Sequence, residues 1–171
     1  MKNSDFILYC GNRNHWQNDL YFAQNKLIEL DSLTFRPSKQ NHNNMAREKI
    51  QVDFLMRASP SLLYRYFTSP GDIMRWFCDG VDVLKGVYTF EWSGSPEEAR
   101  LSENIEDELV RFDWLEDDRA GEYLEFKITK GGVTNQTVLV ITDFCDDDEI
   151  EETKELWAAQ IDALRKATGL G

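Results

Sequence analysis

The chain has 171 residues, a length typical of one domain, and its formal net charge at pH 7 is −12. That acidic balance argues against a protein that binds nucleic acid or an anionic membrane surface, because either function needs a basic face. Apolar residues make up 42% of the chain, which is enough for a core, but no run reaches the roughly 20 apolar residues that cross a bilayer. The apolar stretch among the first residues is short, so we do not expect it to act as a secretory signal.

The first 44 residues differ in composition from the rest of the chain. They contain eight of the ten asparagines and both histidines, with five basic and four acidic residues, whereas residues 45–171 contain 14 basic and 27 acidic residues. The polar stretch at residues 37–44 indicates a linker before Met45. We expect residues 1–44 to be a poorly ordered extension or the product of a start assigned upstream of Met45. The alternative is a genuine extension with a short helix at residues 19–30.

The remaining chain opens with a predicted strand and two predicted short helices. Residues 50–56 alternate apolar and polar side chains, which predicts a strand with one buried face. Ser59-Pro60 follows, and Ser69-Pro70 repeats the pattern ten residues later. Serine caps the first N–H groups of a helix and proline fits its first position, so each pair predicts a helix start. The two helices are expected at residues 60–67 and 70–77.

Short apolar segments separated by turn residues occupy the middle of the chain. Their side chains alternate, so that Phe112 and Trp114, for example, share one face. Gly131-Gly132 predicts a hairpin turn. Strands joined by such short links are expected to form an antiparallel meander. The expected strands span residues 81–84, 87–92, 99–105, 109–115, 122–130 and 134–144.

The last predicted element is the longest helix, at residues 150–168. Trp157 and Ile161 lie on one apolar stripe at helical spacing. The acidic residues 146–149 complement the dipole at its start, and Gly169 ends it. The fold class is therefore α+β, in the order strand, two short helices, about six strands and one long helix.

Several segments carry a family resemblance: ASPSLLY at residues 58–64, TSPGDIMRWF at 68–77, KGVYTF at 85–90, RFDW at 111–114, and the last helix. Together with the order of the elements, they make residues 48–168 resemble the START-like or helix-grip superfamily (SRPBCC), which includes polyketide cyclases and birch-pollen-allergen-like proteins. Within it, the chain most resembles the family of homologues of the activator of heat-shock-protein ATPase.

The resemblance implies a helix-grip fold for residues 45–171, in which a curved antiparallel sheet of about six or seven strands wraps around the long C-terminal helix. A strongly bent sheet and a straight helix cannot touch everywhere. The resemblance therefore also implies a cavity between them that holds a hydrophobic small molecule or a lipid.

Large aromatic side chains fall on the faces predicted to point into that space. For each one, an ordinary place in the core is the alternative to contact with a ligand. The tryptophans are the leading candidates, because indole combines a large apolar face with an N–H donor that could meet a polar group of the ligand. The predicted ligand-binding residues are Trp76, Phe77, Phe90, Trp92, Phe112, Trp114, Phe126 and Trp157.

The sequence offers little for catalysis or metal binding. Nucleophilic catalysis needs an imidazole near the nucleophile, and both histidines, His15 and His42, lie in the first 44 residues. The three cysteines, Cys10, Cys78 and Cys145, are far apart, which favours a reducing cytoplasm over a disulfide framework or a zinc site. We therefore expect a cytoplasmic protein with no catalytic residues, no metal and no cofactor, in which Cys78 and Cys145 are inert apolar groups.

Three functions from different classes follow. We favour non-catalytic binding of a hydrophobic ligand. A protein-interaction, co-chaperone-like or homodimerising domain is the second, and for it Leu139 and Ile141 would form an exposed apolar patch on the outer sheet face. The third is a cyclase-like or hydrolase-like enzyme that uses an inward carboxylate. Glu103 is its candidate, unless a one-residue difference in strand register exposes that side chain.

Overall fold

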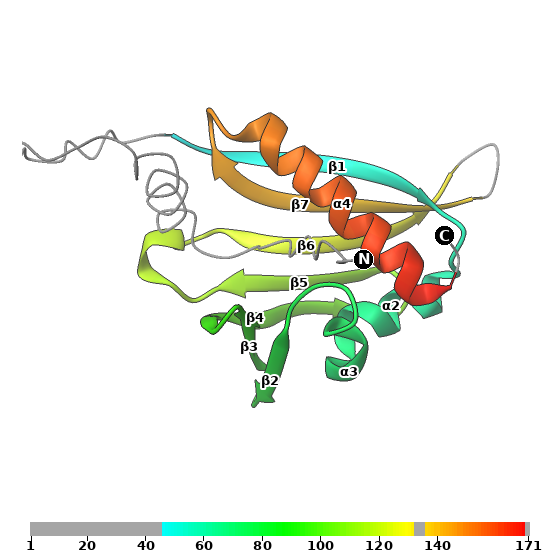
Figure 1. The fold of residues 1–171 in the computed structure, drawn as a ribbon, viewed down its shortest axis with the longest axis horizontal. Coiled ribbons are helices and arrows are strands. Elements are labelled where there is room, and N and C mark those ends of the chain that lie inside the picture. The colour runs from blue at the N-terminus through cyan, green and yellow to red at the C-terminus, as the bar shows by residue number, and fades with distance from the viewer. Residues whose placement is uncertain (1–45, 132–135, 170–171) are drawn as a thin grey trace, which may run out of the picture.

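The computed structural model describes residues 46–131 and 136–169, which form one antiparallel sheet of seven strands and the helices that cover one of its faces (Figure 1). The strand order is β1-β7-β6-β5-β4-β3-β2. The expected α+β fold is confirmed, whereas the expectations for residues 1–44 lie outside the described residues and stay predictions. The elements are β1 (Arg47–Met56), α2 (Pro60–Thr68), α3 (Pro70–Ile73), β2 (Gly80–Leu84), β3 (Val87–Trp92), β4 (Ser95–Ile105), β5 (Leu109–Trp114), the 3-10 helix η2 (Asp117–Arg119), β6 (Tyr123–Lys130), β7 (Thr137–Asp146) and α4 (Ile150–Thr168).

The helices start where the sequence predicts. The Ser59 side chain accepts a hydrogen bond from the N–H of Leu62 at 3.3 Å, with proline at the first helical position, and α2 follows. At Ser69 the backbone carbonyl takes this role and accepts from the N–H of Ile73 at 2.9 Å. The resulting α3 ends at Ile73, earlier than predicted, and the chain continues through turns that carry two aromatic residues into the core.

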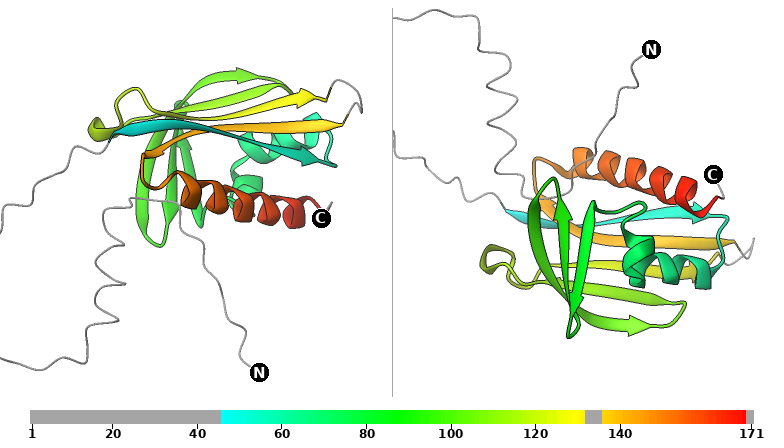
Figure 2. Two further views of the ribbon diagram at one scale, coloured as in Figure 1. Left: turned by 90° about the horizontal axis from the view of Figure 1, so that it is seen from above. Right: turned by 60° about the horizontal axis from the view of Figure 1, so that its bottom comes forward.

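The sheet is strongly curved, and α4 lies along its concave side, as Figure 2 shows. α4 packs against β1 and β7, α2 packs against β5 and β6, and α3 packs against β2. The inward side chains are apolar and large, and Trp157 and Ile161 of α4 meet them with at most 1% of their surface exposed. Fully burying one such side chain stabilises a fold by about 1.5–3 kcal/mol, so the concave face carries most of the stability.

The faces of β7 are the reverse of the prediction. Leu139 and Ile141 are 0% and 1% exposed, so they point inward, and Val138 and Val140 are half-buried on the outer side. The reason is that β7 is apolar at four successive positions, residues 138–141, so its alternation carries no information about which face is inner. The patch expected for a homodimer or a co-chaperone-like partner is therefore not formed by Leu139 and Ile141, and a homodimer stays a prediction.

Strand β4 is longer than predicted and irregular. It begins at Ser95, and its register with β5 shifts between Leu101 and Glu103, so that Leu101 pairs with Phe112 but Glu103 pairs with Arg111. One extra residue in a strand turns every later side chain to the opposite face. Glu103 therefore points to the outer face, and its prediction as an inward carboxylate is wrong. Among the helices within residues 46–131 and 136–169, none is long and apolar enough to cross a membrane.

Candidate functional site

Ten aromatic side chains meet on the concave face. We call them the aromatic cluster: the eight predicted ligand-binding residues together with Phe67 and Tyr88. All eight predicted residues are buried, none of them more than 8% exposed. Phe77 lies at the centre, with its ring centroid 5.3 Å from Phe90, 5.4 Å from Trp92 and 6.3 Å from Trp157. The structure thus brings together the residues predicted from strand and helix periodicity, while contact with a ligand stays a prediction.

The sheet, α2 and α4 each contribute side chains to the aromatic cluster. The sheet supplies Phe126, and α2 supplies Phe67, which stacks on Phe126 with centroids 4.4 Å apart. α4 supplies Trp157, whose ring meets Phe126 edge-on at 6.0 Å. Aromatic pairs at such distances contribute about 0.5–1.5 kcal/mol each beyond their buried area, so the cluster fixes α2 and α4 against the sheet.

The indole N–H groups separate the four described tryptophans into two kinds. Trp76 donates to the Tyr66 carbonyl at 3.1 Å, and Trp92 donates to the Phe77 carbonyl at 2.7 Å. Trp157 donates to Asp143 Oδ2 at 3.0 Å. The buried Nε1 of Trp114 has no acceptor among the residues that the structure describes. Three indoles are therefore committed to holding the fold, and one retains a donor for another partner.

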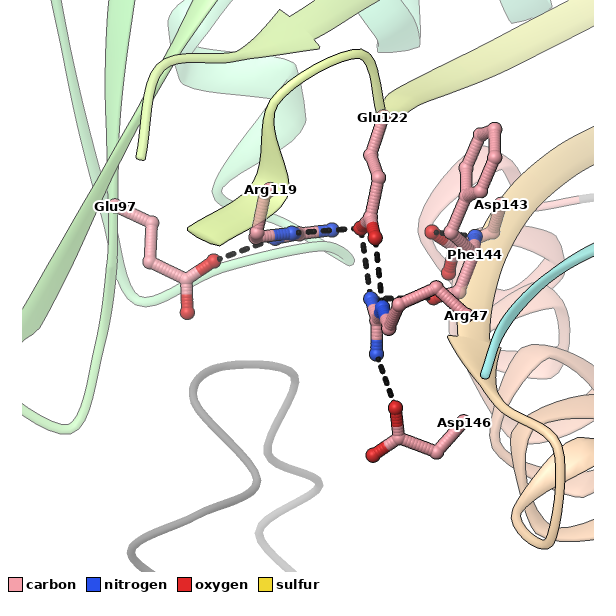
Figure 3. A network of polar contacts seen from close by, with 7 residues as sticks. All are labelled: Arg47, Glu97, Arg119, Glu122, Asp143, Phe144 and Asp146. Atoms are coloured by element: carbon pink, nitrogen blue, oxygen red, sulfur yellow. Dashed lines mark hydrogen bonds and ion pairs between the residues drawn. The ribbon is translucent and has the colours of Figure 1, made fainter. Parts of the chain in front are cut away.

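A row of alternating charges borders the aromatic cluster where β1 and β6 begin and β7 ends. It contains Glu97, Arg119, Glu122, Arg47 and Asp146, in that spatial order (Figure 3), and we call it the charged row. Arg119 bridges Glu97 and Glu122 at 3.2 Å each. Arg47 makes a bidentate contact with Glu122, at 2.6 and 2.7 Å, and reaches Asp146 at 3.1 Å.

Glu122 is the centre of the charged row, and its environment keeps it ionised. Burial tends to raise the pKa of the Glu122 carboxyl, but hydrogen bonds and charges of Arg47, and then of Arg119, outweigh burial and hold that pKa below its ordinary value. The same contact with Glu122 raises the pKa of Arg47, and Asp146 adds to it. The charged row thus ties the starts of two strands together by ion pairs instead of apolar contact.

The charged row was missed from the sequence, although part of its signal is present there. Glu122 shares the strand alternation of Phe126, whose inward direction was predicted correctly. Asp143, a buried carboxylate outside the charged row, shares the alternation of Ile141, whose face was predicted the wrong way round. An acidic residue that alternates in phase with buried apolar residues can therefore be detected in the sequence as a buried carboxylate. The sequence does not show which basic residue pairs with it.

The remaining candidates lie away from this face or are inert. Glu103 is 42% exposed in its side chain and pairs with Arg111 at 3.4 Å on the outer face, where Arg111 also bonds Glu125. Cys78 and Cys145 are buried free thiols, and burial raises the pKa of Cys78 to about 12, so that thiol stays protonated. In the part of the chain that the structure describes, no group of three His, Cys, Asp or Glu side chains is arranged to hold a metal.

A family model for the START-like superfamily domain matches residues 45–170, and the chain belongs to that superfamily. Solved structures with the same fold include the Aha1 dimer from Colwellia psychrerythraea, at 18% identity over 71% of this chain and 96% of that one, with a TM-score of 0.61. Protein BfR322 from Bacteroides fragilis is 32% identical over 71% of this chain and 91% of its own, with a TM-score of 0.53.

A third similar structure is CalU16 from Micromonospora echinospora, at 18% identity over 68% of this chain and 71% of that chain, with a TM-score of 0.51. The identities of the Colwellia and Micromonospora proteins are low enough that these two show the shared fold alone. A comparison with curated proteins finds no match.

Proposed function

We propose that the chain binds a hydrophobic small molecule or a lipid between the concave face of its sheet and α4, without catalysing a reaction. START-like folds commonly bind hydrophobic ligands, and this chain belongs to that superfamily. The observation that carries the proposal is the aromatic cluster, in which the sheet, α2, the segment after α3 and α4 present aromatic rings to one another on a single face. Ligand sites are lined mainly by apolar and aromatic side chains with a few polar groups, and the aromatic cluster has this character.

Native mass spectrometry of gently purified full-length protein tests the proposal directly. We expect a co-purified adduct, or an adduct formed when the protein is incubated with single-chain lipids and with aromatic compounds. Tryptophan fluorescence then gives the affinity, because the four described indoles belong to the aromatic cluster. Absence of any adduct and of any fluorescence change across these compounds would overturn the proposal.

A pair of variants shows whether binding occurs on the concave face. Phe112→Leu changes a fully buried member of the aromatic cluster, whereas Tyr123→Leu changes a half-buried ring on the outer face, beside Phe144. Both substitutions replace an aromatic ring by leucine on neighbouring strands. We expect the first to weaken binding severalfold and the second to leave it unchanged. Equal effects of the two variants would place binding elsewhere.

A further inference from the structure

Among the tryptophans that the structure describes, only Trp114 has an indole N–H with no acceptor within residues 46–131 and 136–169. It is the last residue of β5, and its side chain is buried, with 8% of the residue exposed. Its Nε1 is inaccessible to solvent and finds no hydrogen-bond partner. Buried donors are almost always satisfied, so an unsatisfied one on the face of a proposed ligand site points to an acceptor outside the chain.

Trp114 contacts both apolar and charged neighbours. Its ring meets Phe90 of the aromatic cluster, with centroids 6.2 Å apart. The Arg119 guanidinium of the charged row lies 4.1 Å from the centroid of the same ring, a cation–π contact. The backbone N–H of Trp114 also donates to the Glu122 carbonyl at 3.2 Å. A molecule in contact with the aromatic cluster would therefore meet the Trp114 donor at its polar end.

The charges around Trp114 select against an anionic group. The charged row contains three carboxylates and two guanidinium groups, a formal excess of one negative charge. The guanidinium of Arg119 already donates to Glu97 and Glu122, and that of Arg47 to Glu122, Asp146 and the Phe144 carbonyl. The carboxylates would repel an anionic group of a ligand, and both arginines that could offset this repulsion are already paired with those carboxylates.

Glu116 adds to this selection. Two residues beyond Trp114, its Oε1 accepts from the backbone N–H of Glu98 at 2.9 Å, while its buried Oε2 has no hydrogen-bond partner. A buried carboxylate oxygen close to the end of β5 makes an incoming negative charge still less favourable.

We infer that Trp114 is the polar anchor of the site and that the ligand is an apolar molecule with an uncharged oxygen acceptor, such as a ketone, ester or amide carbonyl, at the end that meets Trp114. This inference rests on the proposed binding of a hydrophobic ligand on the concave face. It adds the chemical class of that ligand and the residue that recognises it.

Three probes of similar size separate the ligand classes: 2-acetonaphthone carries a neutral carbonyl, 2-ethylnaphthalene carries no acceptor, and 2-naphthoate carries a carboxylate. Each is titrated into the 15N-labelled full chain, and the indole N–H resonances are followed. We expect 2-acetonaphthone to bind about fivefold to tenfold more tightly than 2-ethylnaphthalene, the value of one hydrogen bond, and to move the Trp114 indole proton downfield. We expect 2-naphthoate to bind most weakly.

Two matched variants assign the effect to the Trp114 donor. Trp114→Phe keeps an aromatic ring but removes the N–H, and should abolish the preference for 2-acetonaphthone over 2-ethylnaphthalene. Trp92→Phe removes an N–H that already donates to the Phe77 carbonyl, and because Trp92 belongs to the aromatic cluster it should weaken the two neutral probes alike and keep their ratio. Circular dichroism confirms that each variant is folded, and the shift of the indole proton in the unaltered chain gives a second readout that needs no variant.

The outcomes distinguish this inference from the proposed function. Equal binding of the two neutral probes, tightest binding of 2-naphthoate, or a preference that survives in Trp114→Phe would overturn the role of Trp114. In each of these cases binding on the concave face would still stand. Failure of all three probes to bind would overturn the role of Trp114, and the adducts sought by native mass spectrometry would show separately whether the proposed function stands.

Discussion

The aromatic cluster and the charged row adjoin at Trp114, and they hold the fold in different ways. In the aromatic cluster, rings from α2, α4 and the sheet contact one another, and each ring has several neighbours. In the charged row, the side chains are held by directed ion pairs, several of which join positions far apart in the chain. Apolar packing is insensitive to pH and distributes its energy over many contacts, whereas the charged row depends on every member and on protonation.

The energies of the two regions differ in physical origin as well as in size. Each buried ring contributes favourably through the area it removes from water. The attraction within a buried ion pair is offset by the cost of taking its charges out of water. Loss of one partner leaves the other charge uncompensated, which is strongly destabilising. The aromatic cluster therefore supplies stability, while the charged row mainly specifies how the starts of β1 and β6 meet the end of β7.

The largest effect is expected in the aromatic cluster. Phe126→Ala removes a ring that contacts Phe67, Trp76, Phe77 and Trp157, and should lower the free energy of unfolding by about 3–5 kcal/mol. Urea denaturation followed by circular dichroism measures the change.

The matched control lies on the same strand and the opposite face. Tyr123→Ala truncates a half-buried ring on the outer side of β6 and should cost about 1 kcal/mol, close to the centre of the distribution for point mutants. Equal losses in the two variants would mean that the concave face does not dominate stability.

A smaller effect is expected in the charged row. Glu122→Gln keeps the shape of the side chain but leaves Arg47 and Arg119 without their shared carboxylate. We expect a loss of about 2–3 kcal/mol, below the range for a fully buried pair, because the Arg47 side chain is 36% exposed and water screens it. Glu151→Gln, in an exposed pair with Lys154, should change stability by at most about 0.5 kcal/mol.

The same variant tests the pH dependence of the charged row. The pKa of Glu122 is lowered in the folded chain, so its contribution to stability is present above the ordinary carboxyl value of 4.5 and is lost as the pH falls through the lowered pKa. Urea denaturation between pH 7 and pH 3 should show a smaller loss for Glu122→Gln than for the unaltered chain. Parallel curves would mean that other carboxylates govern acid unfolding.

Local signals explain what could be predicted from the sequence. Ser59-Pro60 and Ser69-Pro70 mark helix starts because their capping involves residues only three or four positions away. The apolar stripe of α4 and the inward aromatics follow from periodicity within one element, so the eight aromatic residues were placed on the correct face.

Features that depend on pairing between distant segments could not be predicted. Arg47 meets Glu122 and Asp146 across 75 and 99 residues, and no local pattern specifies which carboxylate a given arginine finds. The shift in register after Leu101 arises in the ladder between β4 and β5, and it alone turned Glu103 outward. In β7, apolar residues on both faces removed the alternation that shows which side is buried.

The smallest effect is expected for the same substitution, tryptophan to phenylalanine, made within the aromatic cluster and at its border with the charged row. Trp92→Phe and Trp114→Phe both shorten an indole to a phenyl ring among buried aromatics, so the loss of packing is similar. The first also leaves the Phe77 carbonyl without its donor, whereas the second removes an N–H that has no acceptor in the described part of the chain. A buried carbonyl that loses its partner is destabilising, so we expect Trp92→Phe to cost about 1 kcal/mol more than Trp114→Phe. Differential scanning calorimetry of the ligand-free chain measures the difference. An equal or larger cost for Trp114→Phe would show that the Trp114 N–H contributes to the fold itself, and would remove the reason to reserve it for a ligand.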